Sequence, residues 1–167
     1  MGRTGSMEFN DLKEFADRLE KITIQYDEFC KLLTKELSAR LLAKVIKRTP
    51  VGDYSNTNTP WKTGGTLRRG WTGGQNRNVN RYLNAISVQK IGKNYMITIT
   101  NPVKYGIYVE FGHRQLPGRY VPAIGKRLKK SWVEGRFMLT ISEMELRQQG
   151  PRIIDKKVKE FLKEMYK

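Results

Sequence analysis

The sequence predicts an α+β fold, in which a long N-terminal helix and C-terminal helices pack on a small antiparallel β-sheet. Apolar residues recur at helical spacing near both ends, over residues 9–48 and from residue 136 onward. Between these segments, residues 82–100 alternate as strands do. The chain of 167 residues is long enough for one core. We therefore expect a flexible extension at residues 1–8, whether native or added, and a single domain at residues 9–167.

The first element is a helix that ends at Arg48. Its apolar positions form one broad stripe that we expect to be buried: Phe9, Leu12, Phe15, Leu19, Tyr26, Phe29, Leu33, Leu37, Leu41 and Val45. Asn10 or Asp11 can cap its start. The β-branched run Ile22-Thr23-Ile24 predicts a break or bend. Pro50 ends the helix, because proline lacks an amide donor and disfavours helix in the preceding residue.

Residues 51–80 are rich in glycine and predict a long loop with one short ordered turn near residues 67–71. Two strands follow, over residues 83–88 and 95–99, joined by a hairpin turn at residues 92–94. Because a two-stranded hairpin alone is marginally stable, either a third strand lies within residues 103–121 or a neighbouring subunit completes the sheet.

The C-terminal third begins with Tyr105, Tyr108 and Phe111, whose spacing favours a short helix that Gly112 ends. Residues 113–136 predict a long basic loop. Helical periodicity returns at Arg136, and Gly150-Pro151 predicts an interruption between two terminal helices.

The residue inventory argues against catalysis. With one histidine and one cysteine in the chain, a zinc site is not expected. Glu110 and His113 lack a nucleophile or a second carboxylate to act with, and Gly64-Gly65-Thr66 lacks the full phosphate-loop pattern. No apolar run approaches the roughly 20 residues of a membrane span. We expect no enzyme, no metal, no cofactor, no small-molecule substrate and no membrane.

The net charge of +16 predicts a nucleic acid or an acidic protein as partner, although a solvated basic face would have the same composition. Four cations cluster before Trp132: Lys126, Arg127, Lys129 and Lys130. Arg68 and Arg69 similarly precede Trp71. Basic residues beside aromatics suit phosphate contact with base stacking, and the alternatives for the lysine cluster are a solvated loop or a docking patch for an acidic protein.

An ordered set of motifs remains: Thr49-Pro50, the segment Thr63 to Arg68, the strands of residues 82–100, the segment Tyr105 to Gly112, and the helix after Phe137. This set, over about residues 9–165, resembles the minor tail, tail-completion or head–tail neck proteins of tailed bacteriophages. The chain departs from that pattern at Gly65-Thr66 and in a basic insertion at residues 114–130.

The resemblance implies a structural virion protein, synthesised in the bacterial host cytoplasm. It would complete the head-proximal end of the tail and join the head connector, or cap a headless tail-like particle, as a six-fold homo-oligomeric ring. Its partners would be tail terminator, tube and head-connector proteins, with DNA contact in the channel. The alternative is a basic DNA-binding protein of a mobile element.

Exposed aromatic and charged side chains in these motifs are candidate ring contacts: Trp61, Arg68, Arg69, Trp71, Tyr105, Tyr108, Glu110 and Phe111. The competing interpretation is that the aromatics of residues 105–112 pack in the core and that Glu110 pairs with a nearby arginine such as Arg68.

Overall fold

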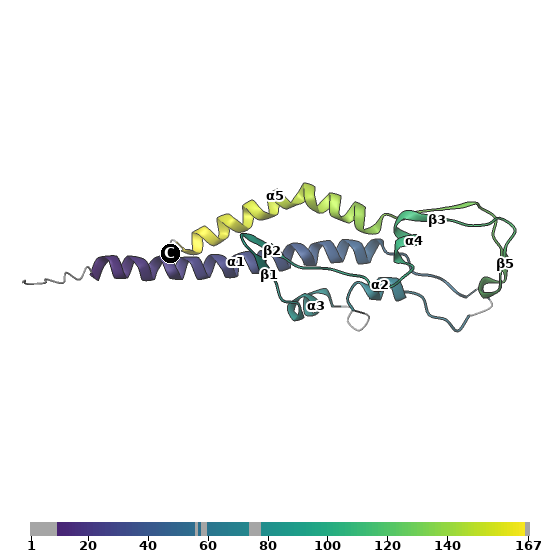
Figure 1. Cartoon of the computed structure of the whole chain (residues 1–167), viewed down its shortest axis with the longest axis horizontal. Coiled ribbons are helices and arrows are strands. Elements are labelled where there is room, and N and C mark those ends of the chain that lie inside the picture. The colour runs from purple at the N-terminus through teal and green to yellow at the C-terminus, as the bar shows by residue number, and fades with distance from the viewer. Residues whose placement is uncertain (1–9, 56, 58–59, 74–77, 166–167) are drawn as a thin grey trace, which may run out of the picture.

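The computed structural model describes residues 10–55, 57, 60–73 and 78–165. The expected extension at residues 1–8 lies outside the described residues. The side chains of Asn10 and Asp11, the expected caps, also lie outside the part that the structure describes. The fold is mixed, as predicted: two long helices run antiparallel beside short helices and small antiparallel β-ribbons (Figure 1).

Helix α1 (Asn10–Arg48) is continuous, so the expected break near residue 23 is wrong (Figure 1). Each β-branched residue costs only a fraction of a kcal/mol in helix propensity, which is too little to break a long helix. The hydroxyl of Thr23 also donates a hydrogen bond to the Leu19 carbonyl of the preceding turn, at 2.8 Å.

Helix α5 (Met138–Met165) is also a single element, so the expected pair of terminal helices is wrong. Pro151 lies inside it, and Figure 1 shows α5 arched away from α1 near mid-length. An interior proline removes one amide donor and crowds the preceding turn, which bends a helix, and Gly150, without a Cβ, avoids part of the clash that proline imposes on its predecessor.

The segment between the long helices begins with α2 (Thr66–Gly70) and α3 (Val79–Ala85), followed by the hairpin of β1 (Gln89–Ile91) and β2 (Asn94–Met96). The turn at Gly92 was predicted, but the first strand was not placed correctly. Asn78 caps α3 by accepting the Arg81 amide, so residues 79–85 form a helix and the strand starts later.

Helix α4 (Gly106–Phe111) confirms the predicted short helix ended by Gly112. The expected basic loop instead contains ordered ribbons. Strand β3 (Gly112–Arg114) pairs with β6 (Trp132–Glu134), and β4 (Tyr120–Val121) pairs with β5 (Lys126–Arg127) around the 3₁₀ turn η1 (Pro122–Ile124). Among the described residues, the strands therefore form three separate two-stranded ribbons and not one sheet.

The core lies beside the C-terminal half of α1, where α2, α3 and α5 converge. Its buried apolar side chains are Leu42, Val45, Leu67, Trp71, Leu83 and Met138. The N-terminal part of α1 extends past the end of α5 (Figure 1), and its side chains from residue 12 to residue 26 are exposed. The predicted broad buried face therefore covers only the second half of this helix.

Candidate assembly surfaces

The buried Thr49 of the Thr49-Pro50 motif holds the segment that contains Arg68 and Trp71 against the end of α1. The Thr49 hydroxyl donates to the Val45 carbonyl at 2.7 Å and accepts the indole N–H of Trp71 at 2.9 Å. The Arg68 guanidinium donates twice to the Thr49 carbonyl, at 2.9 and 2.6 Å. These contacts satisfy the last carbonyl of the turn that ends α1 and fix α2 against it.

Three of the predicted interface residues are thus engaged inside the subunit. Trp71 is only 7% exposed, Arg68 contacts Thr49, and Arg69 donates to the Gly64 carbonyl at 3.1 Å. With its ring buried, Trp71 is not available for base stacking in this conformation.

The second motif group joins α4 to α5 through Glu110, which is 7% exposed. Its carboxylate accepts the amide of Leu139 at 3.0 Å and both the amide and the hydroxyl of Thr140, at 2.9 and 2.8 Å. Glu110 therefore caps the N-terminus of α5, where the helix dipole also favours a negative charge. The expected pairing of Glu110 with Arg68 is wrong.

Backbone contacts reinforce this junction. The amides of Arg136 and Phe137 donate to the carbonyls of Val109 and Glu110, at 2.8 and 3.0 Å. Phe137 adopts a φ of +47°, in the left-handed region that a bulky residue rarely enters. This strained residue lies directly before α5, and its ring lies edge-on to Phe111, with 6.3 Å between ring centroids.

The outer face of α4 is apolar and exposed. Tyr105, Ile107, Tyr108 and Phe111 expose 47–60% of their surface, so the expectation that the aromatics of this motif pack in the core is wrong. We call these four residues the α4 patch. Trp61, at 75% exposed, lies in the loop before α2 and is not part of the patch. The fold thus separates the eight candidate interface residues into internal contacts and exposed aromatics.

The predicted basic cluster lies on the ribbon of residues 112–134, at the end of the molecule opposite the start of α1 (Figure 1). Residues 113–133 contain six lysines and arginines and no acidic residue: Arg114, Arg119, Lys126, Arg127, Lys129 and Lys130. None of them forms a salt bridge within the part of the chain that the structure describes. Exposed Leu116, Tyr120 and Trp132 lie among them. We call this end of the molecule the basic tip.

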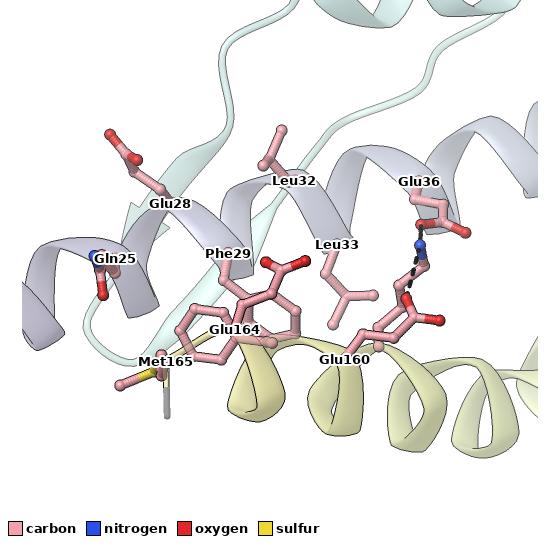
Figure 2. A pocket seen from close by; sticks show the side chains of 11 residues that line it. Gln25, Glu28, Phe29, Leu32, Leu33, Glu36, Glu160, Glu164 and Met165 are labelled. Carbon is pink, nitrogen blue, oxygen red and sulfur yellow. Dashed lines mark ion pairs between the residues drawn. The ribbon is translucent and has the colours of Figure 1, made fainter. Parts of the chain in front are cut away.

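A groove that the sequence did not predict runs between α1 and the C-terminal half of α5 (Figure 2). It measures about 530 Å³. The stacked rings of Phe29 and Phe161, with centroids 4.5 Å apart, form its floor together with Leu33 and Met165. The groove results from two helical stripes that only the tertiary fold brings together.

Acidic side chains line the rim of this groove: Glu28, Glu36, Glu160 and Glu164. Lys157 pairs with Glu36 at 3.4 Å and with Glu160 at 3.5 Å (Figure 2). A hydrogen bond from Arg40, aided by the charge of Lys157, holds the pKa of Glu36 below its ordinary value. Paired with Arg40 and Lys157, Glu36 suits helix–helix adhesion rather than proton transfer.

Asp27, on α1, connects that helix to the β1–β2 hairpin. Asp27 accepts hydrogen bonds from the ammonium of Lys90 at 2.6 Å and the hydroxyl of Tyr95 at 2.7 Å. Hydrogen bonds from Lys31, Lys90 and Tyr95, in that order of effect, hold the pKa of Asp27 far below its ordinary value. The hairpin thus packs on α1 next to the groove and is held there by these hydrogen bonds.

Among the residues with described positions, no group of three or more histidine, cysteine or acidic side chains could hold a metal ion. No helix in this part of the chain is both long enough and apolar enough to span a bilayer.

Comparison with known protein families gives a match over most of the first two thirds of the chain. A model of the family described as "Bacteriophage HK97-gp10, putative tail-component" matches residues 13–112, which include most of α1, the Thr49 contacts, the hairpin and α4. Neither a curated protein nor a solved structure matches the chain.

Proposed function

Because the chain belongs to the HK97-gp10-like family of bacteriophage tail components, we propose that it is a structural virion protein that completes the head-proximal end of the tail. In this role it joins the head connector, or caps a headless tail-like particle, as one subunit of a homo-oligomeric ring. Its neighbours are tail terminator, tube and head-connector proteins, and it performs no catalysis.

The α4 patch carries this proposal. A ring repeats one heterologous contact around a closed axis, so each subunit needs a rigid exposed anchor. Tyr108 and Phe111 are large aromatic residues on a helix fixed to α5 by the Glu110 cap and two backbone hydrogen bonds. Aromatic anchors of this kind dominate interface energies, and a large exposed apolar patch on a soluble protein marks a contact site.

The experiment compares the double variant Tyr108→Ala/Phe111→Ala with wild type, by light scattering and by binding to purified tail tubes. Ile91→Ala is the matched control, because Ile91 is equally exposed but lies on the β1–β2 hairpin. We expect the double variant to lose the ring or the tail-bound form and the control to keep it. A double variant that assembles like wild type would contradict the proposal.

The basic tip favours a second candidate function, DNA binding by a protein of mobile-element origin. Its six cations form no salt bridge within the described chain and would release counterions on contact with phosphates. Duplex binding by a lone subunit that weakens steeply with salt, and weakens further in Lys129→Glu/Lys130→Glu, would favour this function. Within the neck proposal, the same tip contacts either channel DNA or an acidic face of an adjoining ring.

A further inference from the structure

The N-terminal part of α1 presents an apolar stripe that nothing in the described chain covers. Large apolar side chains alternate at spacings of three and four residues: Leu12, Phe15, Leu19, Ile22, Tyr26, Phe29 and Leu33. These are the a and d positions of three successive heptads, the pattern of a coiled-coil seam. The first five side chains are 42–63% exposed.

The same seam is already a helix interface at its C-terminal end. Phe29 stacks on Phe161, and Leu33 lines the groove between the two helices (Figure 2). Helix α5 ends at Met165, beside this point, while α1 continues past it toward its N-terminus (Figure 1), where its a and d side chains are exposed. The exposed stripe therefore continues an interface that the fold already uses, and a further helix can extend it.

The charge of this segment indicates that the partner helix is the same segment of a second copy. Over residues 12–26, three cations (Lys13, Arg18 and Lys21) balance three carboxylates (Glu14, Asp17 and Glu20), whereas the whole chain carries +16. Two copies therefore repel least where these segments meet. The e and g positions, which face a coiled-coil partner, are Ala16, Arg18, Thr23 and Gln25; with one charge among them, they present almost no like-charge conflict to an identical helix.

We infer that residues 12–26 of α1 form an assembly arm that packs in parallel against the same arm of a neighbouring copy, through the a and d stripe. This inference rests on the proposed ring, since copies related by rotation about one axis present their arms in the same direction along it. The ring then has two contacts: the α4 patch on the subunit bodies and a helical bundle formed by the arms.

The test uses the full chain with single substitutions on the arm. Leu19→Glu and Ile22→Glu place a charge in the seam. Ile24→Glu is the matched control, because Ile24 is also exposed, on the same helix, but lies at an f position away from the seam. Sedimentation over a range of concentrations should show the oligomer of the two seam variants dissociating at about tenfold or higher concentration than wild type, and the control unchanged.

Cysteine cross-linking tests whether the helix packed on this stripe belongs to a second copy of the chain. In a Cys30→Ser background, Ile22→Cys should form intermolecular disulfides between copies under mild oxidation, because parallel arms place equal d positions side by side. Ile24→Cys should not. Equal cross-linking at both positions, or none at residue 22, would overturn a parallel arm contact.

The failures are distinguishable. If the seam variants form the same ring as wild type, the arm inference is wrong and the proposed ring stands. If the seam variants lose tail binding while residue 22 never links two copies, the arm binds another tail protein, which also overturns the inference. If wild type forms no oligomer alone or on tails, both proposals fail.

Discussion

Removing the carboxylate of Glu110 should strongly destabilise the subunit, because one side chain caps α5 and fixes α4. Loss of an N-cap costs about 0.5–2 kcal/mol. In Glu110→Ala, the amides of Leu139 and Thr140 also lose their acceptors in a nearly buried site, and each unsatisfied donor adds about 1–3 kcal/mol. Because these two terms partly describe the same bonds, we expect a total of about 2–4 kcal/mol.

The assay is urea unfolding followed by circular dichroism and by tryptophan fluorescence. Glu110→Gln keeps one acceptor oxygen and should lose roughly half as much stability. Glu143→Ala is the matched control on the same helix, since its ion pair with Arg147 is exposed and such pairs contribute about 0–1 kcal/mol. A Glu110→Ala variant no less stable than Glu143→Ala would refute the capping role.

Three further perturbations test the contacts that hold the motifs together. Thr49→Val keeps the side-chain shape but leaves the indole N–H of Trp71 buried and unpaired, so urea unfolding should show a loss of about 1–3 kcal/mol; no loss would contradict the hydrogen bond. Hydrogen bonding from a nearby lysine and the charge of an arginine hold the pKa of Glu145 below its ordinary 4.5, so its ion pairs stabilise the fold above that pH and are lost as the pH falls through the lowered value. The unfolding temperature of Glu145→Gln should accordingly be lower than that of wild type at neutral pH, and the two temperatures should converge at acidic pH. A difference that stays constant with pH would refute this linkage. Gly112→Ala should reduce the unfolding midpoint, because the new Cβ would lie 2.4 Å from the Val133 carbonyl oxygen. Gly112 also has a φ of +82° with an extended ψ, a backbone conformation that costs other residues about 1–3 kcal/mol; an unchanged midpoint would contradict this geometry.

Local periodicity was sufficient to predict the two long helices and the short helix at residues 106–111 but not their continuity. The β-branched run at Ile22 predicted a break from propensity alone, yet propensity differences of tenths of a kcal/mol cannot interrupt a helix of 39 residues. Gly150-Pro151 predicted an interruption, yet the helix continues through Pro151, and the missing Cβ of Gly150 avoids only part of the steric cost.

The candidate contacts were harder to predict, because the sequence does not state which face of a motif points inward. Spacing alone could not show that Glu110 turns into the fold while Tyr108 and Phe111 point out, since this depends on where α5 begins. The groove beside Phe29 depends on Phe161, more than a hundred residues away, and only the packing of α1 on α5 reveals it. The Asn78 cap, by contrast, could have been read before Val79 as a helix start.

The central claim, that this chain is a ring subunit at the tail end, is tested most directly by the mass of the 167-residue chain in solution. Light scattering would be recorded for the protein alone and with purified tail tubes, at low and at moderate salt. We predict a discrete multiple of the 19.4 kDa chain, or a monomer that assembles on the head-proximal end of tails. A monomer that ignores tails and binds duplex DNA would contradict the claim.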